Sequence, residues 1–196
     1  MKRLFIILFF FSFNALAQAD EARISKIRGN TKIDSQDKAV FNLMEEFYFQ
    51  VMQSDAGKLG QDTPRKLDNL FRNGRTRNRH LLLMFMVYQN HISQSAAAGK
   101  RPDTRIQVEL MADLAFEFKN IYNRVPAIIY VYQSEALNAS GQKDAATKVI
   151  EDGLIEYPDS VSLKIYKYLG SKDEAIKTDL VGNHSNHWMV KQFEIK

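Results

Sequence analysis

The chain has 196 residues, a formal net charge of +4 and no cysteine. A chain without cysteine has no disulfide framework, no thiolate zinc site, no cysteine nucleophile and no lipid-modified cysteine. The hydrophobic content of 45% argues against an intrinsically disordered chain, and four prolines with nine glycines argue against a low-complexity one. The length suits one ordinary domain with its own core.

Residues 1–19 have the pattern of an export signal. Lys2-Arg3 gives a positive start, residues 4–13 are almost entirely apolar, and Ala17 and Ala19 form the A-x-A pattern that signal peptidase accepts. The apolar run is too short to cross a hydrocarbon core of about 30 Å, so a membrane anchor is the weaker interpretation. We therefore expect a signal peptide cleaved after Ala19 and a periplasmic or secreted mature chain without a transmembrane segment.

The first part of the mature chain divides into a polar segment and a helix. Residues 20–34 are polar and lack a period, which predicts a flexible or loosely docked lead-in. From Ser35 to about Gln53, apolar residues follow the spacing of one helix face. The residues on that face are Val40, Leu43, Met44, Phe47, Tyr48, Val51 and Met52.

Prolines and glycines mark where the later helices begin and end. Thr104 with Gln107, and Ser171 with Glu174, have the spacing of capping boxes that open helices. The apolar run from Leu81 to Tyr88 predicts a buried helix. The expected breaks fall at Gly74, Gly99, Pro126, Gly141, Pro158, Gly170 and Gly182.

This punctuation predicts an all-α chain of about eight helices. Its short loops favour antiparallel helix hairpins. Residues 128–132, IIYVY, have a β-forming composition, so one strand at this position is the main competing interpretation.

The second half of the chain contains an internal repeat. Segment 141–146, GQKDAA, returns 29 residues later as segment 170–175, GSKDEA, and Pro126 returns as Pro158. A helix pair with small residues at its crossing and a proline at its exit is the unit of an α-solenoid.

On these residues, the stretch 127–158 resembles a tetratricopeptide repeat (TPR). The matching residues are Tyr130, Ser134, Leu137, Gly141, Ala146, Ile150, Gly153 and Pro158. The resemblance implies antiparallel hairpins stacked as a short TPR-like α-solenoid, with repeats and a C-terminal capping helix in residues 104–196. Residues 35–103 would form an N-terminal helical part, made either of degenerate repeats or of an unrelated packing. An ordinary helix bundle is the competing interpretation.

The sequence contains no nucleophile elbow, phosphate loop, dinucleotide fingerprint or H-E-x-x-H motif. His184 and His187 form an H-x-x-H, but they lie in a turn-like sequence without a third zinc ligand beside them. Glu109 and Asp113 lie one helical turn apart and are typical of a solvated helix edge. We therefore expect a protein that is not an enzyme and has neither a metal site nor a cofactor, and an unrecognised helical enzyme is the least favoured alternative.

A cluster of arginines is a candidate anion-binding site. Arg72, Arg75, Arg77 and Arg79 lie within eight residues and could hold an anionic component of the cell envelope. Nucleic acid is not an expected partner, because export removes the protein from most of it. A solvated charged surface is the competing interpretation.

The TPR resemblance implies a non-enzymatic module that binds a protein or peptide. In that family the first helix of a repeat lines a concave surface, and here this places Ile128, Val131, Glu135 and Asn138 on it. A groove of mixed apolar and amide character would suit an extended peptide or a partner helix.

Overall fold

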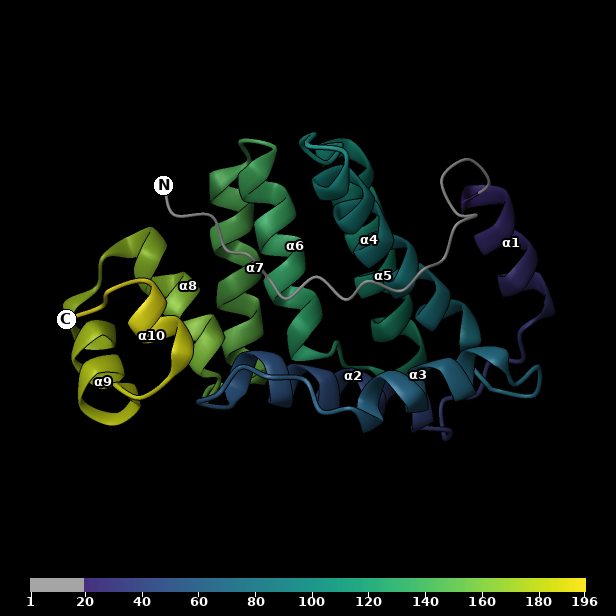
Figure 1. Ribbon diagram of the computed structural model, residues 1–196, viewed down its shortest axis with the longest axis horizontal. Helices are drawn as coiled ribbons and strands as arrows, with labels where there is room; N and C mark the ends of the chain where they lie inside the picture. The colour runs from purple at the N-terminus through teal and green to yellow at the C-terminus, as the bar shows by residue number, and fades with distance from the viewer. Residues whose placement is uncertain (1–19) are drawn as a thin grey trace.

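The structure, a computed structural model, describes residues 20–196, and over this part all of the regular secondary structure is helical (Figure 1). The prediction of an all-α fold is thus confirmed, while the predicted signal peptide at residues 1–19 lies outside the described residues. The ten α-helices are α1 (Asp20–Asn30), α2 (Ala39–Tyr48), α3 (Asp62–Arg72), α4 (Arg79–Ala97), α5 (Thr104–Tyr122), α6 (Ala127–Ala139), α7 (Lys143–Glu156), α8 (Val161–Ser171), α9 (Glu174–His184) and α10 (Trp188–Gln192); a π-helical segment, η1 (Phe49–Gln53), continues α2.

Residues 128–132 lie in α6 and not in a strand. All of the residues from 127 to 132 are buried, so every side of this part of the helix packs against protein. A helix buried all round needs no polar face, and its sequence therefore loses the helical period. The strand interpretation of this segment is wrong for that reason.

Helices α4 to α9 each pack against the helix that follows them in the chain. Figure 1 shows α4, α5, α6 and α7 standing side by side, with α2 and α3 lying across their lower ends. The segment made of α2 and η1 contacts α4, α6 and α8. These contacts connect helices that are distant in sequence, which differs from a solenoid in which each repeat contacts only its neighbours.

Hydrogen bonds hold α2 against the later helices. Glu45 Oε1 accepts hydrogen bonds from Ala127 N at 3.2 Å and from the Tyr157 hydroxyl at 3.1 Å. The hydroxyl oxygens of Tyr48 and Ser160 lie 2.5 Å apart. Side chains of α2 thus satisfy polar groups at the starts of α6 and α8, where helices leave backbone groups unpaired.

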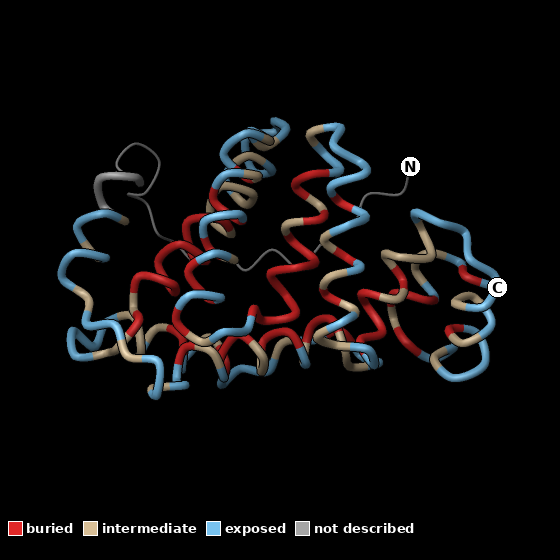
Figure 2. Tube along the Cα trace, turned by 180° about the vertical axis from the view of Figure 1, so that it is seen from behind, coloured by how far each residue is buried: buried red, intermediate tan, exposed pale blue. Residues whose placement is uncertain are grey.

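The core follows the contacts between α2 and the helices above it. Figure 2 shows buried residues concentrated where helices face one another and exposed residues at the loops and outer faces. The ring of Phe47 meets that of Phe85 edge-on at 5.5 Å, and the Phe85 ring stacks on that of Tyr132 at 6.2 Å. The largest fully buried side chains are Tyr88, Tyr132, Phe85, Phe118, Met44, Met52, Leu81, Leu82, Leu83, Met111, Leu114 and Ile128.

The segment predicted as a flexible lead-in contains α1. This helix packs against α4, and its Ile24 and Ile27 lie partly buried against the core. Arg28 forms an ion pair with Glu117 of α5. The sequence predicted a flexible or loosely docked segment here. Two apolar residues and one charge attach α1, although they give residues 20–30 no clear helical period.

The segment that links α1 to α2 is attached through Asn78. The backbone of Asn78 is left-handed, with φ of 55°, a conformation that asparagine tolerates better than most residues. The side-chain amide donates to Asp34 O and to the Tyr122 hydroxyl, both at 2.7 Å, and its oxygen accepts from Asp34 N at 2.9 Å. One buried side chain thus fixes the linking segment onto α4 and α5.

Aspartates cap two helices for which the sequence suggested other residues. Asp103 accepts hydrogen bonds from the backbone N–H groups at the start of α5, and Asp173 does the same for α9. Thr104, a predicted cap, is instead the first residue of α5. Ser171, the other predicted cap, is the last residue of α8. Both aspartates have the extended backbone conformation that an N-cap requires, and either residue type serves that position.

Candidate functional site

The structure separates the four residues that were predicted to line a partner-binding surface. Ile128 and Val131 are completely buried in the core beneath α2, so the interpretation that they contact a partner is wrong. Glu135 is partly exposed and Asn138 is exposed, three residues apart on the C-terminal half of α6. Glu135 and Asn138 are therefore the two of these four residues that a ligand can reach.

Glu135 lies among three tyrosines from three helices. We call Glu135, Tyr88, Tyr132, Tyr166 and Gln89 the Glu135 cluster. The Tyr166 hydroxyl, on α8, donates a hydrogen bond to Glu135 Oε1. The rings of Tyr88, on α4, and Tyr132, on α6, stack with their centroids 5.3 Å apart, and both tyrosines are close enough to Glu135 or to Tyr166 to interact with them electrostatically.

The carboxyl group of Glu135 has no cationic partner among the described residues. Burial raises its pKa from 4.5 to about 7, and the hydrogen bond from Tyr166 lowers it by less. No lysine, arginine or histidine of the described chain contributes to this pKa. A buried carboxyl group without a counter-charge costs stability when it ionises, so this group titrates near neutral pH.

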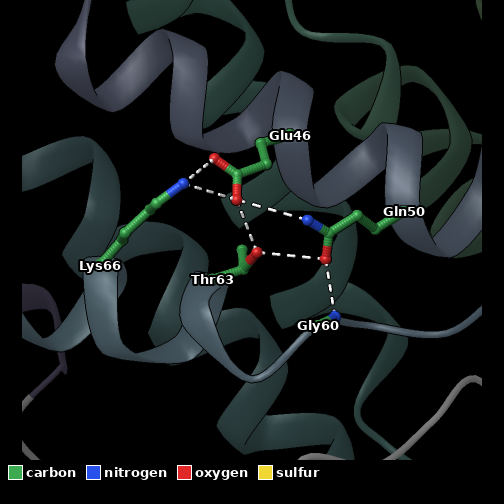
Figure 3. Close-up of polar contacts among 5 residues, drawn as sticks. All are labelled: Glu46, Gln50, Gly60, Thr63 and Lys66. Carbon is green, nitrogen blue, oxygen red and sulfur yellow. Dashed lines mark hydrogen bonds and ion pairs between the residues drawn. The ribbon is translucent and has the colours of Figure 1, made fainter.

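Glu46 shows how the same chain treats a carboxylate that has a structural role (Figure 3). Its two oxygens accept hydrogen bonds from Lys66 Nζ at 2.9 and 2.7 Å, and Oε1 also accepts one from Thr63 at 2.8 Å. The hydrogen bond from Lys66 is the largest of the effects that lower the pKa of Glu46. This network joins α2 to α3 and leaves no carboxylate oxygen without a partner.

Two buried polar atoms in the Glu135 cluster make no hydrogen bond of ordinary geometry. The Tyr132 hydroxyl and Gln89 Nε2 have no such partner among residues 24–196, but the Gln89 side chain lies close enough to Tyr132 for a hydrogen bond that lowers its pKa. Tyr132 itself is 0% exposed. Buried polar groups are normally satisfied, so each exception needs an explanation.

The cluster is not sealed from solvent. Glu135, Tyr166 and Gln89 all retain partial exposure, while Tyr88 and Tyr132 are buried beneath them. The arrangement therefore places an uncompensated carboxyl group within reach of solvent, with aromatic rings and a hydroxyl group below it.

The other buried acid with a raised pKa has a structural explanation. Burial raises the pKa of Glu45, but its carboxylate accepts the hydrogen bonds from Ala127 and Tyr157 described above. Because Ala127 is the first residue of α6, Glu45 serves the start of that helix.

The four predicted arginines lie at the end of α3 (Arg72), in the following loop (Arg75 and Arg77) and at the start of α4 (Arg79). Arg72 forms an ion pair with Asp68, in which its Nε donates to both carboxylate oxygens, at 2.7 and 2.8 Å. Arg75, in the loop before α4, is exposed, whereas Arg77 and Arg79 are partly buried, and none of these three forms an ion pair with a residue between 24 and 196. These three charges therefore have no acidic partner within that range.

The ring of His187 is used within the fold. Its Nε2 lies 3.0 Å from Met52 O, and its Nδ1 accepts a hydrogen bond from Met189 N at 3.3 Å. Burial lowers the pKa of this histidine, so the ring is neutral at pH 7. With both nitrogens engaged, His187 caps α10 and attaches it to η1.

No family model matches the chain, and no match was found among curated proteins or solved structures. Between residues 20 and 196, none of the helices has the combination of length and apolar character needed to cross a bilayer. The function must therefore be argued from the Glu135 cluster and its surroundings.

Proposed function

We propose that the mature protein is an exported, non-enzymatic binding module that holds a protein or peptide on the C-terminal halves of α4, α6 and α8. The observation that carries this proposal is the partly exposed Glu135, which has no counter-charge among the described residues. Glu46, a carboxylate with a structural role, is by contrast paired with Lys66.

The course of α2 and η1 supports the same surface. These elements contact α4, α6 and α8. In the N-terminal halves of α4 and α6, residues such as Phe85 and Tyr132 are buried. Towards the C-terminal end of α6, exposure increases from Glu135 to Asn138. A partner would cover the C-terminal halves of α4, α6 and α8, next to the N-terminal halves that α2 and η1 cover.

A TPR-like arrangement of hairpins α4–α5, α6–α7 and α8–α9 is part of the proposal. In its favour, the helices of each pair contact one another, and α6 also contacts α8. Gly153 lies where a Cβ atom would be 2.9 Å from Tyr130 Cγ and 3.1 Å from Leu163 Cδ1. A small residue at this point allows α7 to approach α6 and α8, as the repeat pattern implies.

Capture of a partner from the envelope fraction of the producing cell tests the proposed surface. With residues 20–196 as bait, Asn138→Arg is expected to reduce capture at least about tenfold, because the arginine lies one turn from Glu135 and would neutralise and cover it. Asn120→Arg, at an exposed asparagine of α5, is the matched control and should leave capture unchanged. Equal capture by both variants would contradict the proposal.

Anion binding by Arg75, Arg77 and Arg79 is the second candidate, supported by their lack of ion pairs within the described chain. The two candidates differ in their response to salt, because exposed charges are screened within about 10 Å at 0.1 M salt. Capture that survives high salt supports the surface around Glu135. Capture that is lost at high salt, and lost again in an Arg75→Ala/Arg77→Ala variant, supports the arginines.

A further inference from the structure

We propose that α1 is a hinged arm that docks onto α4 and α5 at neutral pH and is released when His80 takes up a proton. The arrangement consists of one carboxylate, that of Glu117 on α5, shared between an arginine of α1 and a histidine of α4. It does not depend on the proposed binding surface, because His80 is the second residue of α4 and that surface lies at the other end of the helix.

The carboxylate of Glu117 lies between the two other side chains. Its Oε1 forms the ion pair with Arg28, and its Oε2 lies 3.5 Å from His80 Nε2. The side chain of Glu117 is 7% exposed and that of His80 is 0% exposed. Neither ring nitrogen of His80 makes a hydrogen bond of ordinary geometry with a residue between 24 and 196. A proton on this ring would therefore be placed beside an ion pair that is already complete.

The balance of charge in this buried site opposes that proton. While His80 is neutral, the charges of Arg28 and Glu117 cancel, whereas protonation sets two cations against one carboxylate where water is largely excluded. Burial is the largest effect on the pKa of His80 and lowers it, Glu117 raises it, and Arg28 lowers it again. Docking of Arg28 and protonation of His80 thus weaken each other.

The elements packed against α4 supply only these two charges to the histidine. Helices α1, α2, α3 and α5 all contact α4. Among residues 24–196, Arg28 of α1 and Glu117 of α5 are the charged groups that shift the pKa of His80, and α2, α3 and α4 itself contribute none. The outcome of protonation is therefore decided between Arg28 and His80.

Of these two cations, Arg28 is the one that can leave. His80 is fixed within α4 and completely buried, whereas the side chain of Arg28 is 56% exposed. Apart from this ion pair, α1 is attached through Ile24 and Ile27, which are only partly buried, and it stands at one end of the molecule (Figure 1). Loss of the ion pair therefore removes a large part of what holds α1.

The chain is attached again directly after α1. The backbone N–H of Asn78 donates to Lys32 O at 3.1 Å, and the side chain of Asn78 holds the backbone of Asp34. These contacts do not involve α1 itself. The residues between Asn30 and Lys32 can thus act as a hinge while the rest of the fold keeps its structure.

Amide hydrogen exchange of residues 20–196 tests the release of α1. Protection is expressed against the intrinsic exchange rate at each pH, so the direct effect of pH on exchange cancels. Because the docked state has the lower pKa of His80, docking is complete above about pH 6.5 and weakens as the pH falls below it. Protection of α1 relative to α7 should fall about fivefold or more between pH 8 and pH 5, since one proton changes an equilibrium by at most tenfold per pH unit. Constant relative protection overturns the proposal.

The His80→Gln variant removes the proton-binding ring. Relative protection of α1 in this variant should no longer change between pH 8 and pH 5. His184→Gln, at a partly exposed histidine of α9, is the matched control and should respond to pH as the wild-type chain does. A loss of protection in His80→Gln as large as that in the wild-type chain overturns the role of His80.

Variants of Arg28 keep the proposal testable if His80→Gln does not fold, because Arg28 is exposed. Arg28→Gln should raise the pKa of His80, followed by NMR of the imidazole, by about 0.5 or more, which is about a threefold change in the coupled equilibrium. Arg28→Lys retains the charge and should leave this pKa near its wild-type value. A merely structural role of Arg28 would lower the protection of α1 without moving the pKa of His80, and that result overturns the coupling.

Discussion

Replacing Gly57 by alanine is expected to lower the free energy of unfolding by about 3 kcal/mol or more. Gly57 lies in the loop between η1 and α3, with φ of +58°, in the left-handed region that costs a residue with a Cβ about 1–2 kcal/mol. A Cβ atom at this position would also lie 2.5 Å from Trp188 Cδ1 and 2.7 Å from Trp188 Cε2. The indole ring would have to move.

The ring of Trp188 cannot move without breaking the attachment of α10. Its Nε1 donates to Val51 O at 3.0 Å, and its backbone N–H donates to Asp55 O at 3.1 Å. Trp188 is the one tryptophan of the chain, so its fluorescence reports directly on this contact. We expect the alanine variant to shift the emission towards the red while residues distant from α10 keep their structure.

Gly99→Ala is the matched control for this prediction. Gly99 also has a left-handed backbone, with φ of +64°, but no atom lies within 4 Å of a Cβ built on it. Its replacement should cost about 1 kcal/mol from backbone strain alone and leave the fluorescence unchanged. Equal losses of stability in urea unfolding of the two variants would contradict the role of the contact with Trp188.

Local signals in the sequence predicted most of the helices from α4 onward. Pro126 lies at the N-cap of α6, and the helix before Pro158 ends at Glu156. Proline and glycine act within a few residues of themselves, so their effects can be found without knowledge of the fold. The caps Asp103 and Asp173 were missed because aspartate, serine and threonine compete for the same position within one or two residues.

The features that depend on distant contacts could not be predicted in this way. The helix was predicted to continue to Gln53, but it changes to a π-helix at Phe49. Within this π-helical segment, the side-chain oxygen of Gln53 accepts a hydrogen bond from Val161 N at 2.9 Å. Likewise α1 owes its attachment to Arg28 and Glu117, which are 89 positions apart in the chain. A single sequence gives no sign of either pairing.

Only part of the candidate site could be predicted, because the repeat pattern is local and takes no account of contacts with distant helices. The repeat pattern placed Glu135 and Asn138 on an accessible part of α6, but it also placed Ile128 and Val131 there, because it takes no account of the cover that α2 provides. Of the tyrosines around Glu135, Tyr132 lies on the same helix, but Tyr166 and Tyr88 are 31 and 47 positions away in sequence. Only the assembled fold shows that this carboxyl group lacks a counter-charge.

Glu135→Gln is expected to stabilise the folded chain at pH 8 and to leave its stability at pH 4 unchanged. The folded-state pKa of Glu135, about 7, is higher than the ordinary 4.5, so folding favours the protonated form. This contribution to stability is complete below about pH 4.5 and is lost as the pH rises to about 7. Glutamine cannot ionise, and its side-chain oxygen can still accept the hydrogen bond from Tyr166.

The gain at pH 8 should be on the order of 1–3 kcal/mol, measured by urea unfolding, because partial solvent exposure of Glu135 reduces the full effect of its pKa shift. His80 and His187 act in the opposite direction: burial lowers their pKa values, so stability is lost as the pH falls below about 6.5. Both histidines remain in the variant, and the difference between the two pH profiles therefore isolates Glu135. The control is Glu109→Gln, at an exposed position of α5, which should follow the wild-type profile of stability against pH. If Glu135→Gln also followed the wild-type profile, ionisation of Glu135 would not lower the free energy of unfolding, and the prediction would be wrong.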